Sequence, residues 1–214
     1  MKPVNLFKLI AFCALLLIVR AFKTEHYTFF FLLWNLFLAW IPFWLISQYK
    51  RFKRKSLQFA IIALTLLFLP NAPYILTDLF HLTKNLIAPM WFDLVLILTF
   101  ALLGLVFFIL ATERLFKVLR PFFKSSLLFN AVKFLVILSN GYGIYLGRYL
   151  RFNSWDVVSN PFQLVYRMYH SVFDSAHYKE TLSVTFTFTI FLYLVFEMYE
   201  SFKKRVGDQK NELL

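Results

Sequence analysis

A short segment near the middle of the chain brings together a carboxylate, an imidazole and side-chain amides at helical spacing. Within LPNAPYILTDLFHL, which starts at Leu69, polar residues recur every three or four positions. That spacing places polar side chains on one face of a helix and leaves the opposite face apolar. The polar set is Asn71, Tyr74, Asp78, His81 and Asn85. We therefore expect a polar helix face that interrupts an otherwise apolar part of the chain.

Asp78 and His81 lie one helical turn apart, which suits two kinds of chemistry. The carboxylate can orient the imidazole as an acid and base pair, or both groups can supply half of a metal site. An ordinary exposed pair on an interfacial helix is the alternative. Asp93 follows Trp91 at the start of another apolar run, where a carboxylate either caps a helix or takes part in the chemistry. The candidate catalytic residues are thus Asp78, His81 and Asp93.

A second set of polar and aromatic residues is a candidate for binding. Arg148 and Arg151 fall on nearly one face, and two guanidinium groups can hold a phosphate or a carboxylate. Anchoring at the membrane interface explains them equally well. The segment NSWD from Asn153 forms either a capped turn or a closure over the site. The candidate binding residues are Asn35, Asn71, Tyr74, Asn140, Tyr145, Arg148, Arg151, Asn153, Trp155 and Asp156.

The sequence contains none of the common catalytic or cofactor-binding motifs. There is no glycine-rich phosphate loop, no paired-histidine zinc motif and no serine elbow. The single cysteine, Cys13, excludes an intramolecular disulfide and a cysteine-based metal site. The sequence therefore identifies no cofactor and leaves the metal question open.

Composition indicates a membrane protein. Of the 214 residues, 60% are hydrophobic and only 16% are charged, which is too apolar for a soluble domain of this length. The chain carries a formal net charge of +12, but its basic residues occur in short clusters between apolar runs. That pattern is typical of membrane topology signals. We expect membrane lipids as partners, no nucleic acid, and no identifiable protein partner.

Six apolar segments are long enough to cross a bilayer. They cover residues 4–22, 27–49, 57–76, 92–110, 127–149 and 182–201. The first is interpreted as a retained helix whose Lys8 and Arg20 snorkel, since no cleavage site of small residues follows it. In the last, Thr185, Thr187 and Thr189 alternate like a strand, but an open strand cannot satisfy its backbone in lipid, so we expect a helix.

The positive-inside rule sets the orientation of these segments. The basic cluster between Lys50 and Lys55 is placed in the cytoplasm. The prediction is an all-α, polytopic membrane helix bundle: one domain over residues 1–214, both termini inside, and a charged tail over 203–214. A short helix is expected after the third span. An interfacial helix is expected between the fifth and sixth spans, where Asn160 and Pro161 mark a helix start.

This topology brings the polar candidates to the outer side of the membrane. Asn35 and Asn140 would each lie about 12 Å below the surface, so that they and Asn71 line one outward-opening cavity. Tyr142, Tyr145 and Tyr149 are expected in the aromatic belt. The glycines at 143 and 147 are expected to permit close helix packing.

Four ordered motifs resemble a known family. They are NLFLAWIP from Asn35, LPNAPYILTDLFHL from Leu69, WFD from Trp91 and GIYLGRYLRFNSWD from Gly143. Over roughly residues 27–200 the chain resembles the bacterial integral-membrane family known as domain of unknown function number thirteen-sixty-one. The resemblance implies a multi-pass protein of the bacterial cytoplasmic membrane and supplies no activity.

Three functions remain open at this stage. The first is a membrane enzyme acting on a lipid or lipid-linked envelope substrate, with Asp78 and His81 as acid and base or metal ligands. The second is a carrier or channel for a small solute or ion, lined by the asparagines and Asp78. A scaffold for other membrane proteins is the third. The enzyme is favoured because the polar residues are concentrated on one side.

Overall fold

The computed structural model describes residues 3–82, 87–175 and 178–212, and this part of the chain is helical with no strand. The prediction of an all-α protein is confirmed. Asn85, the last member of the predicted polar face, lies outside the described residues. The helices, with 3₁₀-helices written η, are α1 Pro3–Thr24, α2 Phe31–Gln48, η1 Tyr49–Arg51, α3 Lys55–Phe68, α4 Asn71–Tyr74, η2 Ile75–His81, α5 Met90–Leu119, η3 Arg120–Phe122, α6 Ser126–Arg148, α7 Asp156–Ser159, α8 Pro161–Phe173 and α9 Tyr178–Glu212.

Five helical segments of the described chain are long and apolar enough to cross a membrane. They are Phe31–Arg51, Lys55–His81, Met90–Phe122, Ser126–Arg148 and Tyr178–Gln209. These correspond to the second to sixth predicted spans. The first predicted span does form a helix, α1, of 22 residues, but it is not among the five found in the described residues. Lys8, Arg20 and Lys23 interrupt its apolar run.

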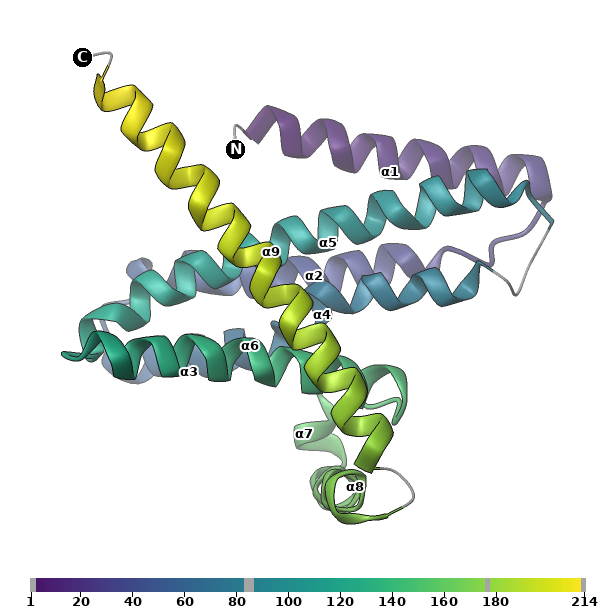
Figure 1. Ribbon diagram of the computed structural model, residues 1–214. Coiled ribbons are helices and arrows are strands. Elements are labelled where there is room, and N and C mark those ends of the chain that lie inside the picture. Colours follow the sequence, from purple (N-terminus) through teal and green to yellow (C-terminus); the bar gives the residue numbers. More distant parts are fainter. Residues whose placement is uncertain (1–2, 83–86, 176–177, 213–214) are drawn as a thin grey trace. The chain divides into compact units, whose positions relative to one another are not determined.

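The chain forms two compact units, residues 1–115 and 116–214, which are described separately. In the first unit, α1 runs alongside the first part of α5 (Figure 1). Arg20 pairs with Asp93, and Ile10 lines the same groove as Phe107, so these two helices are antiparallel. Helix α2 packs against α3, α4 and η2. The prediction of one domain over residues 1–214 stays a prediction.

The segment around LPNAPYILTDLFHL forms α4 and η2 rather than one regular α-helix. Pro73 lacks an N–H and cannot continue an α-helical ladder, and the chain tightens into a 3₁₀-helix from Ile75. With three residues per turn, Asp78 lies above Ile75 and below His81. The prediction that all the polar residues of this segment share one α-helical face was therefore wrong. Asp78 and His81 do lie on the same side.

Burial decides which side of this segment faces the protein. Ala72, Ile75, Thr77 and Asp78 are at most 1% exposed, whereas Phe80 is 50% exposed. Helix α5 packs closely against this segment. A Cβ added at Gly104 on α5 would lie only 2.5 Å from the Ala72 carbonyl oxygen. Only glycine permits so close an approach of two backbones. The carboxylate thus points inward and an aromatic ring points outward.

In the second unit, α6 packs against α9, which crosses it (Figure 1). Of the three alternating threonines, Thr185 and Thr189 are buried and share one stripe of α9 with Thr181, whereas Thr187 is exposed. Gly141 makes the close approach, because a Cβ there would lie 2.5 Å from the Thr185 carbonyl oxygen. The helical interpretation of the alternating threonines is confirmed.

Helix α8 exists where an interfacial helix was predicted, with Pro161 in its first turn. Its buried side chains, Leu164 and Ser171, point to one side. A broad apolar face is left exposed and consists of Phe162, Val165, Tyr166, Tyr169, Val172 and Phe173. An apolar face of this breadth outside the protein core suits a membrane interface.

Candidate functional site

The centre of the candidate site is Asp78, whose carboxylate is buried inside the first unit. Its side chain is 2% exposed. Asn35 on α2 donates a hydrogen bond from Nδ2 to Asp78 Oδ2 at 2.8 Å. A buried carboxylate loses its hydration and needs such donors in exchange. Two predicted candidates that are 43 positions apart in sequence are therefore in direct contact.

His81 completes what we call the Asn35–Asp78–His81 cluster. Its Nδ1 lies 3.2 Å from the Asp78 backbone oxygen and 4.0 Å from the carboxylate Oδ1. A carbonyl oxygen only accepts hydrogen bonds, so Nδ1 is the donor in that contact. The ring also packs on Phe31, with centroids 5.1 Å apart. Because 28% of the His81 side chain is exposed, the imidazole can meet a substrate while the carboxylate stays covered.

This arrangement suits proton transfer. A neutral imidazole held at Nδ1 accepts a proton at Nε2, and the adjacent carboxylate stabilises the imidazolium that forms. Asn35 holds the other carboxylate oxygen, which fixes the Asp78 side chain. The geometry of these three residues can therefore support general acid and base chemistry, with the carboxylate covered.

The described residues do not complete a metal site around the pair. No group of three or more histidine, cysteine, aspartate or glutamate side chains within residues 3–82, 87–175 and 178–212 is placed to hold an ion. The predicted half-site of Asp78 and His81 therefore gains no further ligand of these types in that part of the chain.

The third candidate catalytic residue, Asp93, belongs to a different cluster. Arg20 Nε and Nη2 donate to its two carboxylate oxygens at 2.7 and 3.2 Å. The Arg20 side chain is 1% exposed and its guanidinium lies 4.1 Å from the centroid of the Phe29 ring. The predicted snorkelling of Arg20 is wrong, because the side chain is buried. Asp93 thus joins α5 to α1 through this ion pair.

The structure also places Asn71 and Tyr74 in the segment that leads to Asp78. Asn71 Nδ2 donates to the Phe68 carbonyl oxygen at 3.1 Å and so helps to close the end of α3. Tyr74 is half-buried at the junction of α4 and η2. Both support the turn from which Asp78 projects.

The candidates on α6 are buried in the second unit. Asn140 is 1% exposed and donates from Nδ2 to the Val136 carbonyl oxygen at 2.7 Å. Tyr145 is 1% exposed and stacks between Tyr142 and Tyr149 at centroid distances of 6.2 and 5.3 Å. Burial removes Tyr145 from the predicted aromatic belt. The proposed cavity shared by Asn140 with Asn35 and Asn71 stays a prediction, because they belong to different units.

The segment after α6 is a capped turn. Arg148 is half-buried at the end of α6, and Arg151 is exposed with a φ of 59°, a left-handed conformation that is uncommon outside glycine. Asp156 Oδ2 accepts from the Asn153 N–H at 2.7 Å, and Oδ1 accepts from Ser159 Oγ at 2.9 Å. The first of these hydrogen bonds is the main cause that lowers the pKa of Asp156 below its ordinary value. Trp155, at the N-cap of the short helix α7, is 40% exposed.

Two residues of these clusters were not predicted as site residues. Phe31, which packs on His81, lies one turn before Asn35 on α2. It is one of 29 phenylalanines, and no sequence pattern distinguishes it from the others. The sequence position of Arg20 could have indicated a buried ion pair, because an arginine inside an apolar run needs a carboxylate partner. Choosing Asp93 as that partner required the tertiary structure, since 73 positions separate them.

Comparison with known proteins gives one informative match. Residues 34–195 match the model of the family described as protein of unknown function (DUF1361). The matched region includes the whole Asn35–Asp78–His81 cluster. No curated protein and no solved structure matches the chain.

Proposed function

Because this chain belongs to the DUF1361 family of proteins of unknown function, we propose its function from its own site: it is a multi-pass membrane enzyme that uses the Asn35–Asp78–His81 cluster for proton transfer. The observation that carries the proposal is a buried carboxylate, fixed by Asn35, beside a partly exposed imidazole. In this reading His81 is the general base or acid. Asp78 and Asn35 position it and stabilise its charged form.

The substrate we propose is a lipid or lipid-linked envelope precursor in the bacterial cytoplasmic membrane, met from the outer side. The cluster is formed by two helical segments that are apolar enough to cross a bilayer, Phe31–Arg51 and Lys55–His81. It lies near the start of the first and the end of the second, which is where a lipid head group would be met. The exposed apolar face of α8, in the second unit, independently suits a membrane interface.

The chemistry that fits a single base and carboxylate is attack by a hydroxyl group or water on a head-group ester or phosphoester. Nε2 of His81 would take the proton of the attacking oxygen and later return it to the leaving oxygen. Arg148 and Arg151 remain candidates for binding an anionic group. Their role is a proposal of its own, because they belong to the second unit.

Asp78→Asn tests this proposal with little change of shape. The new amide oxygen still accepts from Asn35 Nδ2, so folding and membrane insertion should persist, while the charge that stabilises the imidazolium is lost. The measurement is mass spectrometry of envelope lipids and cell-wall precursors in cells lacking the gene, with wild type or a variant restored. A species should accumulate on deletion, disappear with wild type and persist with Asp78→Asn or His81→Gln.

Asp208→Asn is the matched control, because it makes the same chemical change at an exposed position of α9. It should behave as wild type. If the envelope is identical in all strains, the lipid enzyme is excluded. Loss of solute uptake in the Asp78→Asn strain would then point to the carrier, and a misfolded Asp78→Asn protein would point to a purely structural cluster.

A further inference from the structure

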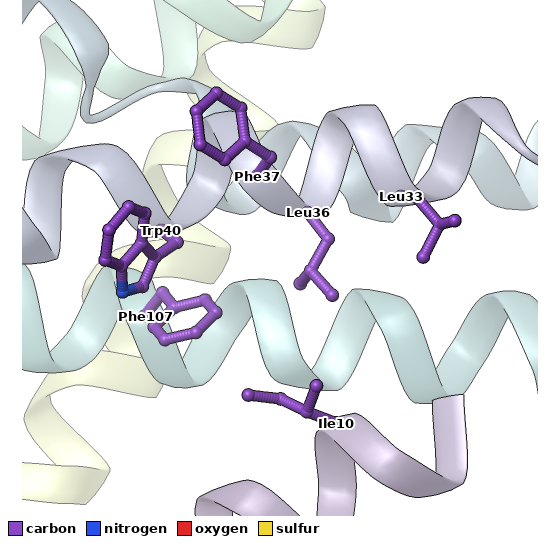
Figure 2. A pocket seen from close by; sticks show the side chains of 6 residues that line it. All are labelled: Ile10, Leu33, Leu36, Phe37, Trp40 and Phe107. Carbon is purple, nitrogen blue, oxygen red and sulfur yellow. The ribbon is translucent and has the colours of Figure 1, made fainter. Parts of the chain in front are cut away.

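The first unit contains an apolar groove that the proposed chemistry does not use. It has a volume of about 320 Å³ and is open to the surroundings. Figure 2 shows its walls, which come from three helices: Ile10 on α1, Phe107 on α5, and four side chains of α2. The α2 residues are Leu33, Leu36, Phe37 and Trp40. All six are apolar apart from the indole N–H, so the groove has no fixed group to hold a charged ligand.

The position of the groove along the helices identifies the medium around it. Trp40 lies in the middle of α2, and Phe107 lies in the middle of α5. Both helices belong to segments apolar enough to cross a bilayer. At that depth a membrane offers hydrocarbon and almost no water. Within the first unit the described residues leave the groove open, since Ile10, Leu33, Phe37 and Trp40 are between 36% and 47% exposed.

From this placement we propose that the groove is a binding site for one acyl chain of a membrane phospholipid. An empty groove would leave its lining atoms without dispersion contacts on one side. A chain lying in a concave site touches its walls on several sides, whereas a chain on a convex helix surface touches one. A chain in the groove is therefore held more strongly than the lipid that covers the rest of the unit.

The groove is separate from the Asn35–Asp78–His81 cluster. At about 100° per residue, the lining residues of α2 lie roughly 100–200° around the helix from Asn35. The two sites therefore occupy different faces of α2. Consequently the proposal does not rest on the catalytic role of Asp78, and either can fail alone.

The test follows the fluorescence of Trp40 in a variant whose other four tryptophans are replaced by phenylalanine. The full-length protein in detergent is titrated with a phosphatidylcholine carrying 9,10-dibromostearoyl chains, which quench indole on contact. Leu36→Phe fills the groove, and Leu33→Phe narrows its rim at an exposed position. Either should raise the lipid fraction needed for half-quenching by about threefold, the effect of losing a handful of carbon contacts.

Leu102→Phe is the matched control, because Leu102 is 49% exposed on α5 and does not line the groove. It should leave the quenching curve unchanged, and so should Asp78→Asn. Circular dichroism verifies that each variant keeps its helices. The proposal is overturned if the two groove variants match the control. It is also overturned if free dibromostearic acid saturates Trp40 but the phospholipid does not.

Discussion

At the scale of single residues, the two carboxylates buried among the described residues of the first unit have different partners. Asp78 accepts from a neutral amide and lies beside an imidazole, whereas Asp93 forms a two-pronged ion pair with Arg20. Arg20 donates to both carboxylate oxygens of Asp93 and so occupies them. A carboxylate beside an imidazole can instead share in moving a proton. We therefore propose that Asp78 takes part in the chemistry and that Asp93 has a structural role.

The ion pair of Arg20 and Asp93 makes a testable contribution to stability. Arg20→Met should lower the free energy of unfolding by about 3–5 kcal/mol, because it leaves the Asp93 carboxylate buried without a partner. The double variant Arg20→Met with Asp93→Leu should recover most of that loss. Denaturant-induced unfolding in mixed micelles gives both values.

Lys23→Met serves as the control for this pair, since Lys23 is an exposed cation on the same helix. It should change stability by no more than about 0.5 kcal/mol. A double variant as unstable as Arg20→Met alone would show that the two residues do not act as a pair.

The stability of the turn before α8 should depend on pH, because the turn is held by the Asp156 carboxylate. Its pKa is lowered in the folded protein, mainly by the Asn153 N–H. The Asp156 carboxylate therefore stabilises the turn fully at any pH above about 3.9, the ordinary pKa of an aspartate. This stabilisation is lost as the pH falls from there through the lower pKa of the folded protein. Hydrogen exchange of the α7 and α8 amides, corrected for intrinsic rates, should show protection falling below about pH 4.

Asp156→Ala isolates the carboxylate in the same experiment. Loss of a helix-end hydrogen bond of this kind costs about 1 kcal/mol, so protection at neutral pH should decrease and its pH dependence should flatten. A variant that keeps the wild-type pH profile would assign the titration to another group.

At the scale of elements, the site depends on how closely α5 approaches α4. Asp78 follows α4 directly, and the Ala72 carbonyl oxygen lies where a side chain at Gly104 would have to be. Because the obstructing atom belongs to the backbone, it cannot move without shifting the whole segment. The distance between Asp78 and Asn35 is therefore set partly by a glycine on a third helix.

Gly104→Ala should disturb the site without touching its polar groups. We expect a loss of about 1–3 kcal/mol of stability from overpacking, together with reduced function as Asp78 moves away from Asn35. Denaturant-induced unfolding and the envelope-lipid assay measure the two effects.

Gly207→Ala provides the comparison, because a Cβ at that position on α9 meets nothing within 4 Å. It should be neutral or up to about 1 kcal/mol stabilising, since alanine is the better helix former. Equal effects of the two substitutions would mean that α4 and α5 are not in tight contact.

At the scale of the whole molecule, the number of spans decides where the chain ends lie. The described chain has five helices fit to cross a membrane, and α1 has the length of a sixth. Six crossings place both ends of the chain on the same side, whereas five place them on opposite sides. The buried ion pair with Asp93 favours insertion of α1, because it neutralises the one arginine in its apolar run.

We predict six crossings with both termini in the cytoplasm. Reporter tags at the two ends should be protected together in intact cells and become accessible together once the membrane is opened. A cysteine placed at Ser56, an exposed position at the start of α3, should label only from the inside. Cys13 is buried and should not interfere. Accessibility of one terminus from outside would instead support five crossings.

What the sequence by itself determined is the class of the protein and most of its elements. Length and apolar composition indicate helices fit to span a membrane, because a helix pairs its backbone polar groups within one segment. The same argument correctly overruled the alternating threonines of α9. Residue types and their spacing also indicated Asp78, His81 and Asn35 as candidate site residues, since burying polar groups in a membrane costs free energy.

Only the tertiary structure decided which of these residues meet. Asn35 with Asp78 and Arg20 with Asp93 are paired across 43 and 73 positions, and no local period encodes such contacts. The sequence also missed the change from α-helix to 3₁₀-helix at Ile75, which shifts the face carrying Asp78. The missing N–H of Pro73 interrupts the α-helical ladder there, and the close approach of Gly104 to Ala72 holds the segment against α5.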